Sequence, residues 1–96
     1  MLRQVDAAPV ATLVQDSDLA VRRLAVATVG TFRTADARLA LEAAVVDDAD
    51  PAVRRNAAWA LGRIGDAASR DALRAAMEDS SSLVRTTAKV AYSMTR

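Results

Sequence analysis

One pattern of residues occurs three times along this chain of 96 residues. The segments read "DLAVRRLAVATVGTF" from Asp18, "DPAVRRNAAWALGRI" from Asp50 and "SSLVRTTAKVAYSMT" from Ser81. The positions in register are Val21, Val53 and Val84, then Arg22, Arg54 and Arg85, then Ala25, Ala57 and Ala88. A period of about thirty residues is the signature of a repeat architecture, in which each copy forms a unit that stacks on the next.

Each copy predicts two helices. The first, helix A, begins after a capping side chain at Asp18, Asp50 or Ser81 and carries apolar residues at helical spacing. Gly65 offers a left-handed stop to the second of these helices. The other, helix B, is expected at roughly residues 35–47 and 67–79. Because a single pair cannot bury its apolar stripe, we expect an all-α solenoid of about three stacked hairpins.

We expect residues 1–96 to form a single domain, or a piece of a longer array. Its expected parts are helix B of a first unit at 1–16, repeats at 17–48 and 49–80, and a terminal helix A at 81–96. One face of the terminal helix is apolar, and no helix B follows to cover it; its residues are Val84, Ala88, Ala91 and Tyr92. Val90 and Met94 make the helix apolar on a second side. Since terminal repeats normally present a polar outer face, we expect self-association through this helix.

The composition excludes several kinds of active site. The chain has no cysteine and no histidine, which removes thiolate metal sites, thiol nucleophiles and the usual general base. Phosphate-binding glycine loops and hydrolase elbows are also missing. We therefore expect a protein that is not an enzyme and that uses no metal and no cofactor. No apolar run approaches membrane-spanning length, so a cytoplasmic location is expected.

The stretch "DPAVRRNAAWALGRIGD" resembles the HEAT repeat, in particular the short HEAT-like repeat named after phycobilisome lyases. The first copy departs from the pattern, with Phe32 and Arg33 where Ile64 and Gly65 stand. The resemblance implies a right-handed α–α superhelix whose B helices line a concave surface. Some HEAT-like proteins bind di-iron through His–Glu pairs, and that activity is not carried over to a chain without histidine. The resemblance also implies a ladder of aspartates and arginines six positions apart, at Asp16 and Arg22, Asp48 and Arg54, and Asp79 and Arg85.

Trp59 is the most informative candidate for binding a partner. Arg55 and Arg63 lie one helical turn before and after it. A tryptophan between arginines is typical of interface hot spots. The same position also suits a residue that covers a neighbouring A helix, with the arginine stems packed along it. Further candidates on the outward side of the B helices are Arg38, Arg70 and Arg74. The alternative interpretation is that these arginines belong to a solvated face whose positive and negative charges compensate each other.

These features favour a scaffold that binds another protein, and nothing in the sequence identifies that protein. One alternative is an accessory or chaperone subunit resembling bilin lyases, which the resemblance alone suggests. The other is a binder of nucleic-acid backbone. The net charge of +1 and the interspersed signs argue against that alternative.

Overall fold

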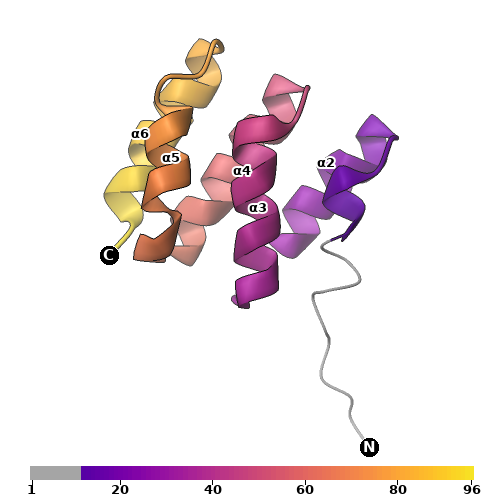
Figure 1. Cartoon of the computed structure of the whole chain (residues 1–96), viewed down its shortest axis with the longest axis horizontal. Helices are drawn as coiled ribbons and strands as arrows, with labels where there is room; N and C mark the ends of the chain where they lie inside the picture. The colour runs from indigo at the N-terminus through magenta and orange to yellow at the C-terminus, as the bar shows by residue number, and fades with distance from the viewer. Residues whose placement is uncertain (1–11) are drawn as a thin grey trace, which may run out of the picture.

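The computed structural model describes residues 12–96, and these form helices arranged in two layers (Figure 1). The A layer consists of α2 (Leu19–Val29), α4 (Pro51–Ile64) and α6 (Ser82–Met94). The B layer consists of the 3-10 turn η1 (Thr12–Gln15), α3 (Ala35–Asp47) and α5 (Arg70–Ala76), the last preceded by the 3-10 turn η2 (Ala67–Ser69). Successive elements alternate between the layers, and α4 packs against both α2 and α6. The predicted all-α solenoid is confirmed.

The helix starts follow from the capping residues that the repeat contains. The side chains of Asp18, Asp50 and Ser81 each accept a hydrogen bond from a backbone N–H in the first turn of the following helix. At the end of α4, Gly65 has a φ of 74° and donates its N–H to the carbonyl of Leu61. This is the left-handed stop that the sequence predicts. The helix B expected in residues 1–16 lies mostly outside the described residues.

The second B helix is shorter than the predicted 67–79. The Asp66 side chain accepts a hydrogen bond from the Ala68 N–H, and this local bond winds residues 67–69 as a 3-10 turn. The α-helix therefore begins at Arg70, and it ends at Ala76. Beyond it, the Met77 N–H donates to the carbonyls of both Leu73 and Arg74, which tightens the last turn.

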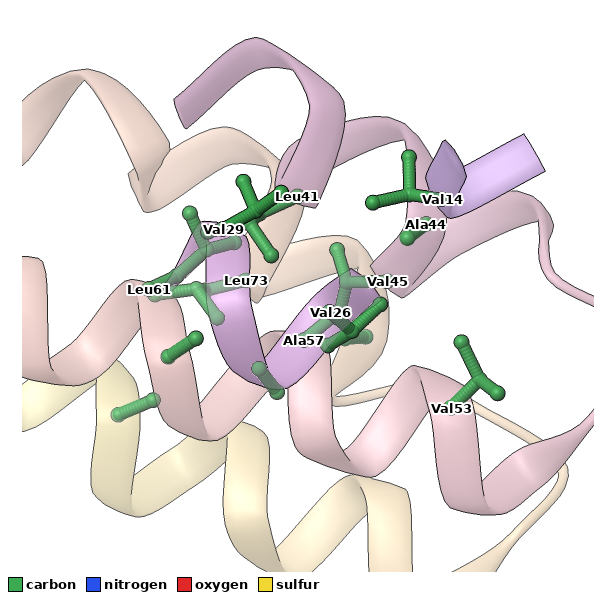
Figure 2. Packing of buried hydrophobic residues seen from close by; sticks show 14 of the residues in the cluster. Val14, Val26, Val29, Leu41, Ala44, Val45, Val53, Ala57, Leu61 and Leu73 are labelled. Carbon is green, nitrogen blue, oxygen red and sulfur yellow. The ribbon is translucent and has the colours of Figure 1, made fainter. Parts of the chain in front are cut away.

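The core between the layers is a row of leucine and valine side chains (Figure 2). The largest fully buried apolar side chains are Leu41, Leu61, Leu73, Val26, Val29, Val45, Val53 and Val84. The repeat therefore places Val53 and Val84 in equivalent surroundings. Val21 occupies the matching position of α2 but is only half-buried, because the described B-layer element before it is a single short turn. The core is thus continuous along the stack, as expected for a solenoid.

The A helices approach one another most closely at glycines. A Cβ atom on Gly30 would lie 2.8 Å from the Cβ of Ala60, and one on Gly62 would lie 2.8 Å from both Cα and Cβ of Ala91. Carbon atoms that are not bonded pack at about 3.5–4.0 Å, so only glycine fits at this helix spacing. The sequence predicts close approach at the aligned alanines, which are indeed buried. The tightest contacts lie five positions after them.

Candidate functional site

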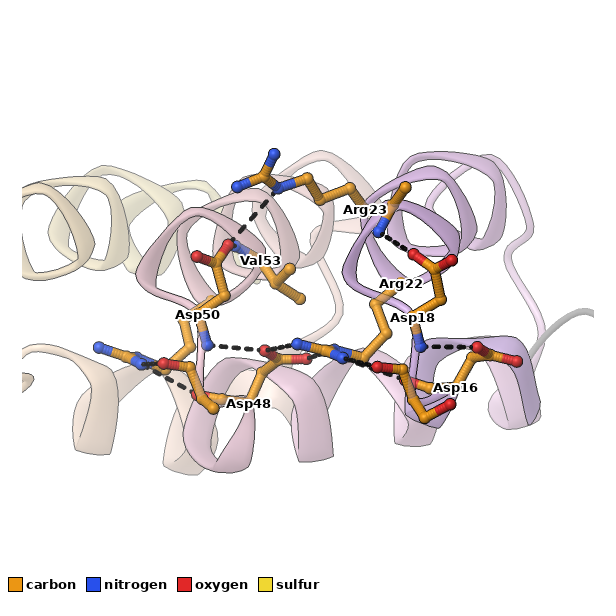
Figure 3. Close-up of polar contacts among 11 residues, drawn as sticks. Asp16, Asp18, Arg22, Arg23, Asp48, Asp50 and Val53 are labelled. Atoms are coloured by element: carbon orange, nitrogen blue, oxygen red, sulfur yellow. Dashed lines mark hydrogen bonds and ion pairs between the residues drawn. The ribbon is translucent and has the colours of Figure 1, made fainter.

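A ladder of arginines and aspartates holds the turns between repeats together (Figure 3). The Arg22 Nε donates to Asp48 Oδ2 at 2.9 Å, and its Nη1 donates to the main-chain carbonyl of Asp16 at 3.1 Å. Arg54 repeats this arrangement with the Asp79 carboxylate at 2.9 Å and the carbonyl of Asp48 at 2.9 Å. Each of these arginines thus binds the carbonyl of the aspartate six positions before it, and its carboxylate partner is the aspartate of the next repeat. Among residues 12–96, Arg85 binds only carbonyls, those of Asp79 at 2.8 Å and Ser80 at 3.2 Å.

The ladder aspartates also fix the chain direction at each turn. Asp48 Oδ1 accepts the N–H of Asp50 at 2.8 Å, and Asp79 Oδ1 accepts the N–H of Ser81 at 2.8 Å. Their side chains are 4% and 10% exposed in the ion pairs with Arg22 and Arg54. Buried carboxylates need such partners, since an unpaired one costs several kcal/mol or so. These contacts are those of a structural element.

The pKa of Asp79 reports how strongly the ladder favours ionised groups. The hydrogen bond from the Arg54 guanidinium lowers the pKa of Asp79 below its usual range, against the opposing effect of burial. The same hydrogen bond raises the pKa of Arg54. The folded chain therefore favours the ionised carboxylate. This contribution to stability is complete above the unfolded pKa of an aspartate and is lost as the pH falls through the folded pKa of Asp79.

In the B layer, Arg38 is engaged within the chain. It forms an ion pair with Glu42 at 2.6 Å, and its Nε lies 3.7 Å from a carboxylate oxygen of Asp66. Glu42 also accepts a hydrogen bond from the hydroxyl of the buried Ser69 at 2.9 Å. This network joins α3 to the turn before α5, so Arg38 has a structural explanation.

Arg70 and Arg74 lie against Tyr92 of α6. The Arg70 Nε donates to Thr95 Oγ1 at 2.9 Å, and its Nη2 donates to the Thr95 carbonyl at 3.1 Å. The Arg74 Nη2 donates to the Tyr92 hydroxyl at 2.9 Å. Both guanidinium groups also lie over the tyrosine ring, 5.4 and 5.6 Å from its centroid, within cation–π range. Arg38 and Arg70 are thus both engaged within the chain, as in a face that compensates its own charge.

A groove in the A layer lies between α2 and α4, and Trp59 forms part of its wall. This Trp59 groove has a volume of about 260 Å³ and is lined by Val26, Ala27, Gly30, Asn56, Trp59, Ala60 and Arg63. The tryptophan is 44% exposed. Ala27 holds in α2 the repeat position that Trp59 holds in α4, and its small side chain leaves the groove open. Trp59 thus faces α2 across the groove and presents nearly half of its surface to solvent.

The arginines beside Trp59 have few partners of their own. Within residues 12–96, neither Arg55 nor Arg63 forms an ion pair, and Arg55 donates only to Asn56 Oδ1, at 3.1 Å. Arg33 reaches the C-terminal end of α4, where its Nη1 donates to the Ile64 carbonyl at 3.1 Å. Trp59 and its two arginines are the candidates that the sequence predicts. Gly30 and Asn56, which also line the groove, were not predicted, although the repeat places Gly30 in register with Gly62.

The terminal A helix exposes apolar residues on the outside of the A layer. Val90 is 47% and Met94 is 37% exposed, and Val90 holds the repeat position of Trp59. The positions matching Ala58 and Gly62, which α4 buries, are Lys89 and Ser93 in α6, and both are exposed. The side of α6 facing away from α4 is therefore polar there. The face expected to lie uncovered is in fact part of the core, since Val84, Ala88 and Ala91 are fully buried. The exposed apolar residues Val90 and Met94 lie on the outside of the layer.

The described residues contain neither a membrane span nor a cluster of metal ligands. Between residues 12 and 96, no helix combines the length and the apolar character needed to cross a membrane. The same part of the chain contains no cluster of three or more histidine, cysteine or carboxylate side chains placed to hold a metal ion.

Comparisons with known proteins agree with this architecture. The sequence profile for HEAT repeats matches residues 7–93. Human deoxyhypusine hydroxylase, solved in complex with glycerol, aligns at 29% identity and a TM-score of 0.82 over 92% of this chain and 31% of its own. The complex of CpcE and CpcF of phycocyanin lyase from Nostoc sp. PCC7120 aligns at 32% identity and a TM-score of 0.83, over 96% of this chain and 38% of the matched chain. No curated protein matches the sequence.

These matches correct one expectation. The prediction that the chain is not an enzyme is contradicted, because a hydroxylase and a lyase share its fold over nearly its whole length. The chain spans only about a third of each of these neighbours, at 31% and 38% of their lengths. The missing histidine and cysteine exclude particular chemistries. They do not exclude a place within a larger enzyme, and the sequence argument overlooked that distinction.

Proposed function

The chain belongs to the HEAT-repeat family, and we propose that it is a protein-binding scaffold whose recognition site is the Trp59 groove. One observation carries the proposal: Trp59, 44% exposed, forms a wall of the groove. It lies between Arg55 and Arg63, which form no ion pair with any residue from 12 to 96. Tryptophan and arginine are the residues most enriched at interface hot spots. In this proposal residues 17–48, 49–80 and 81–96 are repeat units of a single domain, and the ladder keeps them rigid.

The test compares partner capture by the wild-type chain and by Trp59→Ala. Loss of one specific partner in the variant is the expected result, because truncating a central aromatic anchor costs about 2 kcal/mol or more of binding free energy. Leu24→Ala is the matched control, since Leu24 is 70% exposed on α2 and does not line the groove. Circular dichroism verifies that both variants stay folded. An unchanged set of partners with Trp59→Ala removes the groove as the recognition site.

A second candidate function is a place in an assembly like phycocyanin lyase. The alignment at 32% identity over 96% of this chain favours it. The chain would then supply an arm of HEAT repeats that holds another subunit or a bilin-bearing protein. Mixing the chain with a bilin and recording the absorption spectrum tests this candidate. A spectrum that is the sum of the two separate spectra at every concentration speaks against it.

Self-association through α6 stays a prediction. It rests on the exposed apolar residues Leu83, Val90 and Met94, which are 53%, 47% and 37% exposed. They are spaced along one face of the helix, and a second copy would cover them. Light scattering at high micromolar concentration decides between a monomer and a dimer, and Val90→Asp is the variant expected to abolish a dimer.

A further inference from the structure

The described carboxylates are distributed unevenly between the two layers, whereas arginines occur in both. The helices α2, α4 and α6 contain seven cations and no carboxylate. Every carboxylate of residues 12–96 lies in α3, in α5 or in a segment that connects helices. The formal net charge of +1 hides this separation. The A layer therefore contributes only positive charge along its helices, and its field attracts anionic groups.

Only part of this positive charge is available to a partner. The ladder engages three of the seven cations through their hydrogen bonds, namely Arg22, Arg54 and Arg85. Arg23 lies 3.6 Å from a carboxylate oxygen of Asp50. Arg55 and Arg63 are exposed and have no carboxylate partner among the described residues. Lys89, the seventh cation, is also exposed without an ion pair among these residues, but it lies on α6 and does not line the Trp59 groove. The available charge nearest this groove is thus placed one turn before and one turn after Trp59.

The size of the Trp59 groove limits what can enter it. Its volume of about 260 Å³ is below the range of roughly 300–1,000 Å³ that is usual for small-molecule pockets. The floor is closed where Gly30 meets Ala60, since the two helices touch there. The space between Ala27 and the Trp59 ring suits one large apolar side chain of a protein partner. A cofactor would be too large for it.

We propose that the Trp59 groove binds an acidic peptide segment that carries one large apolar anchor residue. This inference rests on the proposed function and adds the chemistry of the partner. The anchor packs against the Trp59 ring, and carboxylates on either side of it pair with Arg55 and Arg63. A guanidinium presents a planar fork of donors that matches a carboxylate. Because no carboxylate lies in α2, α4 or α6, the acidic segment meets no like charge along these helices.

Intrinsic fluorescence provides the test, because Trp59 is the only tryptophan of the chain. The probes are synthetic peptides of about 18 residues, long enough to form a helix if the groove requires one. One combines glutamates with leucine anchors, the second replaces the glutamates by lysines, and the third replaces the leucines by serines. We expect the first peptide to shift the Trp59 emission to shorter wavelength. Binding of the other two should be at least about tenfold weaker, and the first should weaken as salt screens the charges.

A pair of variants separates local from general charge effects. Arg63→Glu and Lys89→Glu change the net charge equally, and Lys89 is exposed on α6 away from the groove lining. We expect Arg63→Glu to weaken binding of the acidic peptide about tenfold more than Lys89→Glu. Equal weakening by both variants, or equal binding of the acidic and basic peptides, overturns the proposal.

Other occupants would give different outcomes, and each of these overturns the inference. A shift of the Trp59 emission only with anionic lipid vesicles would indicate a membrane surface, and a shift only with duplex DNA would indicate nucleic acid. A shift that depends on the concentration of the chain in the absence of peptide would indicate a second copy. The proposed function fails separately, when Trp59→Ala leaves partner capture unchanged. If Trp59→Ala abolishes capture while the peptides show no charge preference, only the acidic chemistry is wrong.

Discussion

Gly62→Ala places two known effects in opposition at the contact between α4 and α6. In an isolated helix, replacing glycine by alanine stabilises by about 1 kcal/mol. Here the new Cβ would lie 2.8 Å from Cα and Cβ of Ala91 and 3.3 Å from the sulfur of Met94. The thioether can turn away, but the Cα belongs to the backbone of α6, so the whole helix must move. Overpacking of this kind costs about 1–3 kcal/mol.

We therefore expect Gly62→Ala to lower the free energy of unfolding by about 1 kcal/mol, since the packing cost exceeds the gain in helix propensity. For a domain of this size, that corresponds to a melting temperature lower by about 4–8 °C. Thermal and urea unfolding followed by circular dichroism measure both quantities. Ala27→Gly is the control for propensity, because Ala27 is an exposed residue inside α2. Its destabilisation gives the propensity term without a clash.

A second substitution tests whether Ala91 is the cause. In Gly62→Ala with Ala91→Gly, one of the two close carbon atoms is gone and the Cα remains. We expect partial recovery, with a coupling of about 0.5 kcal/mol or more between the two changes. If Gly62→Ala melts at or above the wild-type temperature, α6 is free to shift and glycine does not set the helix spacing. Strict additivity of the two substitutions would refute the reasoning as well.

Two further predictions concern the polar contacts. Arg54→Met should lower the unfolding free energy by about 2–3 kcal/mol near neutral pH, because Asp79 loses a forked donor while remaining mostly buried. The difference in unfolding free energy between the wild type and Arg54→Met should shrink as the pH falls through the lowered pKa of Asp79. A difference that stays constant in urea titrations down to about pH 3 would contradict an ionised Asp79 in the ladder. Arg33→Ala should cost about 0.3–1 kcal/mol and speed hydrogen exchange in the last turn of α4, whose carbonyl at Ile64 it caps; exchange unchanged there would show that the cap is dispensable.

The repeat made most of the fold predictable from the sequence. Capping residues located the start of each A helix, and Gly65 located the end of α4, because both signals are local. Val53 and Val84 are buried as the register requires. Val21 is not, because burial depends on what precedes the helix in the stack. The 3-10 turn at the start of the second B helix was not predicted. It depends on the hydrogen bond from the Ala68 N–H to the Asp66 side chain, which a pattern of apolar positions does not reveal.

The polar contacts were less predictable because they join distant residues. The spacing of six positions paired Asp16 with Arg22 and Asp48 with Arg54, but left open whether each guanidinium binds a carboxylate or a main-chain carbonyl. Arg22 bridges 26 residues to its carboxylate. Arg70 was expected on an accessible surface, yet it binds Thr95, 25 residues later. Likewise, Trp59 alone predicts an aromatic surface residue, and the groove exists because a small alanine lies opposite it on α2.

The ladder also determines how the stack responds to tension. Asp48 receives Arg22 on its carboxylate and Arg54 on its carbonyl, and Asp79 receives Arg54 and Arg85 in the same manner. The contacts form one unbroken line from the first turn between repeats to the last. A force that pulls the repeats apart must therefore rupture these links one after another. When the chain is stretched from its ends, we expect it to unfold in discrete steps, each of which releases about one helical hairpin.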